Sequence, residues 1–172
     1  MVAEPARVKP FLRWVGSKAK LLPELLKWVP PDYSTFHEPF LGSGALFFAL
    51  QPKHGAVEAL LNATVINSDF RETERRAVAG DFCYFDPPYI SVSKTAEFTS
   101  YTAGGFRHAD QITLRDTALR LKARGVHVLL SNSDTPTTRE LYARFELREI
   151  TRGGGMNSDT TKRARVGELL IR

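Results

Sequence analysis

The sequence predicts an α/β fold, in which strands and helices alternate and a ligand binds at one edge of the sheet. Residues 35–40 form a strand-like stretch, which leads through a glycine turn into the apolar helical segment 45–50. Residues 82–85 are a short apolar and aromatic run, typical of a buried strand. The amphipathic segment 109–124 and the apolar strand 126–131 continue the alternation.

Length and composition fit one soluble domain. The 172 residues are 42% hydrophobic, which is enough to form a core. No apolar run reaches membrane-spanning length, and residues 1–9 lack the apolar centre of a signal peptide, so we expect a cytoplasmic protein. The single cysteine, Cys83, excludes an internal disulfide, and the four histidines have no cysteine partners for a zinc site. The net charge of +5 is compatible with a nucleic-acid partner without requiring one.

The motif Asp86-Pro87-Pro88-Tyr89 directly follows the strand 82–85. Two prolines cannot continue a sheet ladder, so the strand must end there and present Asp86 at its carboxyl edge. Asp86 and the Pro87 carbonyl could each accept one hydrogen of an exocyclic amino group, and Tyr89 could stack on the ring that carries it. The alternative is an ordinary proline turn after a strand.

The glycine turn after the first strand predicts a second part of the ligand site. Gly42 and Gly44 follow the strand directly, and glycine lets a backbone approach a ligand closely. The spacing lacks the third glycine of the dinucleotide fingerprint. The turn therefore favours a ligand that has an adenosine but no pyrophosphate.

Three further side chains could contact such a ligand. Residues 65–69 read as a short strand that ends in Asp69, where an acid often binds ribose hydroxyls, although a solvated strand end is equally compatible. Trp14 and Lys18 flank a turn before a predicted helix over 18–28, with Ser17 as its N-cap. From their spacing alone, we expect Trp14 to pack in the core and Lys18 to be a solvated surface charge.

The remaining segments are connections. Residues 70–81 are too few for a full crossover helix, and only Val78 could anchor the charge cluster 71–76, so we predict an irregular or mobile strap over 70–79. The loop 90–103 carries two aromatic residues beside the candidate site and suggests a lid. Strands 147–151 and 168–171 are expected to form a hairpin, joined by the basic, glycine-rich stretch 152–165.

Taken together, these segments resemble the Dam-like family of DNA adenine methyltransferases, which use S-adenosylmethionine. Several motifs match in the family's order and cover most of the chain apart from its termini and residues 70–79. The matching segments are FLRWVGSK at 11–18, EPFLGSGA at 38–45, GDFCYFDPPY at 80–89, FTSYT at 98–102, GF at 105–106, SNSDT at 131–135 and ELLI at 168–171.

The resemblance implies a Rossmann-like methyltransferase sheet, mostly parallel, with an antiparallel strand near one edge. It implies methyl transfer from S-adenosylmethionine, without a metal, to the exocyclic amino nitrogen of adenine in DNA after base flipping. The implied catalytic residues are Asp86, Pro87 and Tyr89. The implied cofactor-binding residues are Trp14, Lys18, Glu38, Pro39, Phe40, Gly42, Gly44, Asp69 and Asp86.

The chain departs from the family in one respect. The family carries a domain-sized target-recognition insert between the ribose acid and the Asp-Pro-Pro-Tyr strand, so we expect one catalytic domain that lacks this insert between about residues 70 and 79. Three explanations for the missing insert remain open: a natural minimal enzyme, an engineered deletion, and a sequence joined across a missing segment. Methylation of adenine in RNA, and a catalytically silent cofactor- or DNA-binding module, are the alternative functions. We predict weak, salt-dependent and unselective binding to duplex DNA.

Overall fold

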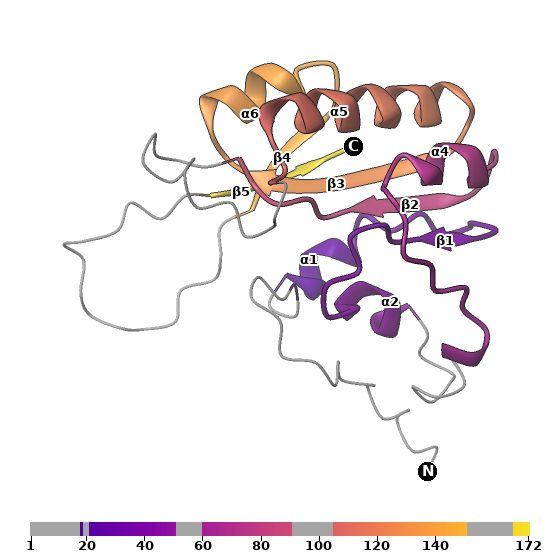
Figure 1. Cartoon of the computed structure of the whole chain (residues 1–172). Helices are drawn as coiled ribbons and strands as arrows, with labels where there is room; N and C mark the ends of the chain where they lie inside the picture. The colour runs from indigo at the N-terminus through magenta and orange to yellow at the C-terminus, as the bar shows by residue number, and fades with distance from the viewer. Residues whose placement is uncertain (1–17, 19–20, 51–59, 91–104, 151–166) are drawn as a thin grey trace, which may run out of the picture.

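The protein is described by a computed structural model that covers residue 18 and residues 21–50, 60–90, 105–150 and 167–172 (Figure 1). One five-stranded sheet has the order β1-β2-β3-β5-β4. Its strands are β1 (Phe36–His37), β2 (Phe82–Phe85), β3 (His127–Ser133), β4 (Leu147–Ile150) and β5 (Glu168–Ile171).

Strand directions agree with the expected mixed sheet. β1 pairs with β2, and β2 with β3, in parallel. β5 is antiparallel to both β3 and β4, so β4 runs in the same direction as the first three strands. The predicted strand positions 82–85 and 168–171 and the hairpin pairing are confirmed, and the sheet is mostly parallel with an antiparallel strand next to one edge.

Helices cover both faces of this sheet, as Figure 1 shows. Phe82 and Tyr84 pack toward the side of α1 and α2, whereas Cys83 and Phe85 pack with residues of α5. Because β2 is buried on both faces, all four of its residues are apolar or aromatic. The helices are α1 (Leu22–Leu25), α2 (Ala45–Ala49), α4 (Glu72–Arg76), α5 (His108–Ala123) and α6 (Pro136–Leu141).

Helix α5 follows its sequence pattern closely. Leu114, Ala118 and Leu121 are fully buried against the sheet, as their spacing predicts. The chain leaves the helix through Gly125, whose φ of 81° lies in the left-handed region that glycine adopts readily. A Cβ at this glycine would lie 3.3 Å from the Ala79 Cβ, so α5 also packs closely on the segment before β2.

The predicted helix over 18–28 is much shorter in the structure. Among the residues of this range that the structure describes, only those of α1 are α-helical, and Leu21 is the N-cap of this helix. Pro23 lies within the first turn, where its missing N–H costs nothing, but it would break a helix that began several residues earlier. Leu25 is fully buried, whereas Leu26, which was expected on the same apolar face, is 42% exposed. Ser17 lies outside the described residues.

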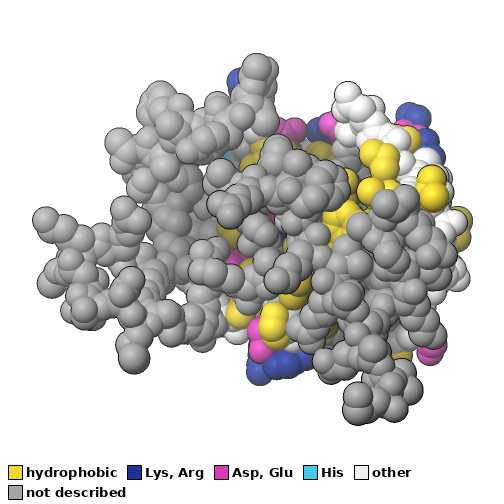
Figure 2. All heavy atoms as spheres, turned by 90° about the horizontal axis from the view of Figure 1, so that it is seen from below, with side chains coloured by type: hydrophobic (Ala, Val, Ile, Leu, Met, Phe, Trp, Pro, Cys, Tyr) yellow, Lys and Arg dark blue, Asp and Glu magenta, His cyan; other side chains and the backbone are white. Residues whose placement is uncertain are grey.

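The predicted strand over 65–69 is wrong. These residues have no regular secondary structure, and Val65 and Ile66 are 71% and 45% exposed. β1, the edge strand of the described sheet, is only two residues long and offers few backbone groups for a further strand. Exposed hydrophobic side chains are visible in yellow on the face of the molecule shown in Figure 2.

The prediction of an irregular strap over 70–79 is right only in part, because α4 forms over Glu72–Arg76, whereas residues 77–79 belong to no helix or strand. Phe70, Thr73 and Ala77 are buried and anchor this helix, whereas Val78, the expected anchor, is 58% exposed. The helix has five residues, so the expected absence of a full crossover helix is confirmed.

Contacts with α5 explain why this charged segment is ordered. Arg120 donates to both carboxylate oxygens of Glu74, at 2.7 and 2.9 Å. Arg124 donates to the backbone carbonyls of Glu74 and Ala77, both at 2.6 Å. Glu74 and the backbone at the end of α4 are therefore held by tertiary contacts, which a local sequence pattern does not reveal, whereas Arg75 and Arg76 pair with Glu72 within the helix.

Candidate active site

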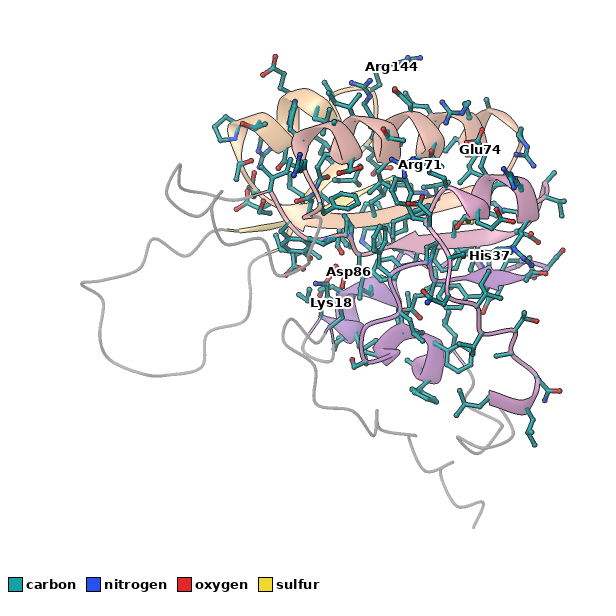
Figure 3. All side chains as sticks on the ribbon, viewed as in Figure 1. Lys18, His37, Arg71, Glu74, Asp86 and Arg144 are labelled. Atoms are coloured by element: carbon teal, nitrogen blue, oxygen red, sulfur yellow. The ribbon has the colours of Figure 1, made fainter. Side chains whose placement is uncertain are left out.

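Asp86 follows β2 directly and is held through one oxygen of its carboxylate. Lys18 Nζ lies 2.8 Å from Asp86 Oδ1, and Ser131 Oγ donates to the same oxygen at 2.8 Å. Figure 3 shows the Lys18 and Asp86 side chains close together near the end of β2. Burial raises the pKa of the Asp86 carboxyl above its ordinary value, and Lys18 and Ser131 only partly oppose this rise.

Ser131 is itself held by a buried phenol. The Tyr84 hydroxyl lies 3.0 Å from Ser131 Oγ. Because the Ser131 proton is directed to Asp86, Tyr84 is the donor in this pair. Tyr84 lies on β2 and Ser131 on β3, so neighbouring parallel strands fix the orientation of the Asp86 carboxylate.

Lys18 is shared between two acidic side chains. Its Nζ lies 3.3 Å from Glu168 Oε1 on β5, in addition to its contact with Asp86. The same ammonium lies 4.4 Å from the centroid of the Tyr89 ring. The Lys18 side chain is only 10% exposed, so the solvated charge that its spacing favoured is not observed.

The Pro-Pro-Tyr turn after Asp86 is anchored to the protein at several points. Gln111 Nε2 donates to the Pro88 carbonyl at 2.8 Å, and Asn132 Oδ1 accepts from the Ile90 N–H at 3.1 Å. Asn132 Nδ2 in turn donates to Gln111 Oε1 at 3.1 Å. The Tyr89 hydroxyl donates to Glu168 Oε1. Burial raises the pKa of this phenol, which therefore stays a proton donor at neutral pH.

The glycine turn and the acid before it lie between β1 and α2. Gly42 and Gly44 have φ of 53° and 66°, and a Cβ at Gly44 would lie 3.2 Å from the Phe48 ring, so this turn requires glycine. Glu38 Oε2 accepts from the Phe47 N–H at 3.2 Å. Burial, with a smaller contribution from the Asp86 charge, raises the pKa of Glu38 to about 8, against the opposing effect of that hydrogen bond.

Other predicted contact residues have different environments. Phe40 stacks on Phe70 with ring centroids 5.7 Å apart, within an aromatic cluster beside the core. Pro39 is half-buried in the segment between β1 and the glycine turn. Asp69 is exposed and accepts hydrogen bonds from the backbone N–H and the guanidinium of Arg71. Trp14 lies outside the described residues, as do most of the predicted lid and the predicted connection 152–165.

A family model for the D12 class N6 adenine-specific DNA methyltransferases matches this chain over residues 14–58 and 54–153. The two stretches include the glycine turn, the Asp-Pro-Pro-Tyr motif and the polar end of β3. The chain belongs to this family. The second stretch includes residues 70–79, and the two stretches overlap at residues 54–58.

Curated relatives agree with this D12 assignment. A type II methyltransferase of Lactococcus lactis subsp. cremoris, M1.LlaDCHI, is 27% identical over 271 aligned positions, which cover 95% of each chain. The alignment is longer than the 172 residues of this chain, so part of that relative has no counterpart in it. The DNA adenine methylase of Vibrio cholerae serotype O1 is 38% identical over 136 residues, and that of Escherichia coli strain K12 is 33% identical over 135 residues.

The chain spans about half the length of the DNA adenine methylases that it matches. Each alignment covers 78% of this chain and 49% of the methylase. The family and the names of these relatives support adenine-specific DNA methylation, for which S-adenosylmethionine is the general methyl donor of methyltransferases. Among the described residues, no group of three or more His, Cys, Asp or Glu side chains could hold a metal ion, and no helix could cross a membrane.

Several residues around Asp86 and Tyr89 were not assigned a role from the sequence. Ser131 and Asn132 were matched to the family segment SNSDT and Glu168 to ELLI, but no contact was predicted for any of them. A signal was present in each case, because polar residues inside or next to buried strands need partners. Which partners they have depends on strand order, which local patterns do not contain.

Proposed function

We propose that this chain is the catalytic part of an adenine-specific DNA methyltransferase and transfers a methyl group from S-adenosylmethionine to the exocyclic amino nitrogen of adenine in DNA. The observation that carries this proposal is the carboxylate of Asp86, which is held by Lys18 and Ser131 through Oδ1 at the end of β2. The described residues that hydrogen-bond to Asp86 all reach Oδ1. We therefore assign Oδ2 to the amino group of the adenine.

The described residues fit the cofactor in two respects. S-adenosylmethionine supplies an electrophilic methyl group on a positively charged sulfur, and the site holds the carboxylates of Asp86 and Glu168 around the single ammonium of Lys18. An excess of negative charge favours a cation. The glycine turn also lets the backbone approach a ligand beside Glu38. In this proposal Lys18, Glu38 to Phe40, Gly42 and Gly44 contact the cofactor, with Trp14 from the segment before them.

Catalysis then depends on acceptors for the amino group. The lone pair of that nitrogen is delocalised into the adenine ring, which makes it a poor nucleophile. Hydrogen bonds from its two N–H groups to Asp86 and the Pro87 carbonyl direct the lone pair toward the methyl group. The new N–C bond forms as the S–C bond breaks, and the amino group gives up one proton through Asp86. The Tyr89 ring stacks on the flipped base and offsets part of the unstacking cost.

We further propose that the family segment absent from this chain is missing near residues 54–58 rather than 70–79. Both stretches of the family match end or begin there, and the second continues through α4. Asp69 then follows the absent segment instead of preceding it, and its contacts are to Arg71. We therefore withdraw Asp69 from the proposed ribose contacts. Without the segment, duplex binding by this chain is expected to be weak, salt-dependent and unselective.

The test is transfer of a labelled methyl group from S-adenosylmethionine to adenine-containing duplex DNA at low salt. We expect the label in N6-methyladenine for the natural chain. Calorimetry should show cofactor binding by the natural chain and by Asp86→Asn. A folded chain that binds no S-adenosylmethionine, or that methylates RNA in preference to DNA, would contradict the proposal. A chain that binds the cofactor but transfers no label would support the silent module, which the family match and the relatives do not favour.

A further inference from the structure

Glu168 is a buried acid in an otherwise apolar strand. It is 2% exposed at the start of β5, whereas the next three residues, Leu169, Leu170 and Ile171, are fully buried and apolar. A carboxylate in such a place is unfavourable unless it has partners. In this structure its Oε1 accepts a hydrogen bond from the Tyr89 hydroxyl and lies 3.3 Å from Lys18 Nζ.

These two partners belong to the candidate active site but come from separate parts of the chain. Tyr89 follows β2, and Lys18 precedes α1. The sheet brings the end of β2 near Glu168, because β3 pairs with both β2 and β5, and its antiparallel pairing with β5 places Glu168 opposite Ser133 at the carboxyl end of β3. Glu168 therefore contacts both the Tyr89 hydroxyl and the ammonium that pairs with Asp86.

We propose that Glu168 is a positioning residue for the methyl transfer proposed above, and that it acts by fixing the Tyr89 ring and by holding Lys18 between two carboxylates. This inference rests on the proposed function. With its hydroxyl held, the Tyr89 ring keeps one orientation toward the flipped base. With its charge shared, Lys18 neutralises Asp86 only in part, so Asp86 remains a strong acceptor for the amino group.

Steady-state kinetics of two variants at Glu168 test this role. We expect Glu168→Ala to lower kcat about tenfold or more, because the lost interaction acts on the base and on Asp86. The dissociation constant of S-adenosylmethionine should rise by a smaller factor, because one of the two carboxylates that favour the cation is removed. Glu168→Gln keeps an acceptor for Tyr89 and should recover part of kcat. A matched control is Glu149→Gln, which removes an exposed carboxylate from the neighbouring strand β4 and should leave kcat unchanged.

A double-mutant cycle with Tyr89→Phe separates this role from general stabilisation. Tyr89→Phe removes the hydroxyl but keeps the ring. If Glu168 acts through that hydroxyl, the loss in kcat for Glu168→Ala with Tyr89→Phe should be smaller than the product of the two single losses. Glu168→Gln should also move the acid limb of the kcat/KM profile to lower pH, because the Glu168 charge helps to raise the pKa of Asp86.

The outcomes are distinguishable. If the natural chain transfers no methyl group, the proposed function fails and this inference fails with it. If the natural chain is active while both Glu168 variants keep its kcat, or if the losses in the cycle simply multiply, only the inference is overturned. If Glu168→Ala does not fold, Glu168→Gln tests the sharing of the Lys18 charge instead: an unchanged kcat together with an unmoved acid limb overturns the inference.

Discussion

Asp81 and Asp86 lie at opposite ends of the same four-residue strand, and their carboxylates have different partners. Asp81 accepts from the backbone N–H groups of Thr35 at 3.1 Å and Val78 at 3.0 Å, and its Oδ2 lies 2.9 Å from His37 Nε2. Both of its oxygens are therefore used. Asp86 is held through one oxygen only, by the side chains of Lys18 and Ser131.

The pKa values of the two carboxyls shift in opposite directions. Burial raises the pKa of Asp81, but the hydrogen bond from Val78 and the contacts with His37 and Thr35 outweigh it, and the net pKa is lowered. For Asp86, burial dominates and the net pKa is raised. A carboxylate fixed by backbone donors stabilises the fold, whereas one that is desolvated and only partly paired keeps an acceptor for a ligand.

Of the single substitutions at the two ends of β2, Asp86→Asn should have the largest effect. This effect should be on activity alone. Loss of a charged acceptor in the transition state should lower kcat about a hundredfold or more. The fold should be retained, because an amide oxygen can still accept from Lys18 and Ser131, and Lys18 keeps Glu168. Thermal unfolding should show equal or slightly higher stability at neutral pH, since a raised folded pKa means that the ionised carboxyl destabilises the fold. A large loss of stability would show that both acids serve the fold.

Asp81→Asn should have the opposite profile. An amide offers one acceptor oxygen where the carboxylate uses two, so we expect a loss of about 2 kcal/mol in the free energy of unfolding. Because the folded pKa of Asp81 is lowered, its contribution is present above the ordinary pKa and is lost as pH falls through the lowered value. Denaturant unfolding of variant and natural chain should therefore converge in acid. Asp116→Asn, at a partly exposed acid on α5, serves as the control.

Ser131→Ala should reduce activity by about tenfold, since it removes one hydrogen bond of about 1.4 kcal/mol from the Asp86 carboxylate. Tyr84 also loses its partner, so a small loss of stability should accompany the kinetic effect. Thr113→Ala removes an exposed hydroxyl from α5 and should change neither property. Full activity of Ser131→Ala would show that Lys18 alone suffices to orient Asp86.

His37→Gln should have the smallest effect, a loss of about 1 kcal/mol in the free energy of unfolding. The two backbone donors to Asp81 remain, so the end of β2 keeps most of its hydrogen bonds. Methyl transfer by the folded variant should be unchanged, because His37 contacts Asp81 and not the Asp86 end. A kinetic defect without a loss of stability would show that the two ends of the strand do not have separate roles in stability and activity.

The sequence by itself determined the elements in which the residues that the local pattern predicts to be buried are also buried in the structure. Two prolines after an apolar run fix where β2 ends, and the spacing of Leu114, Ala118 and Leu121 predicts α5. Both signals are local, because a proline removes a ladder donor wherever it stands and a helix repeats every 3.6 residues. The prolines also predicted the place of Asp86 at the strand end, and the family motifs added the prediction that Asp86 is catalytic.

Only the tertiary structure decided which charges meet and which apolar residues are covered. The Glu74 carboxylate of α4 is held by Arg120 on α5, and the apolar residues Val65 and Ile66 stay exposed because the described sheet gives them no strand to pair with. Lys18 and Glu168 lie far apart in sequence and meet beside Asp86, where the order of the strands places the start of β5 near the end of β2. Such pairings depend on topology and on long-range burial, which the pattern of neighbouring residues does not encode.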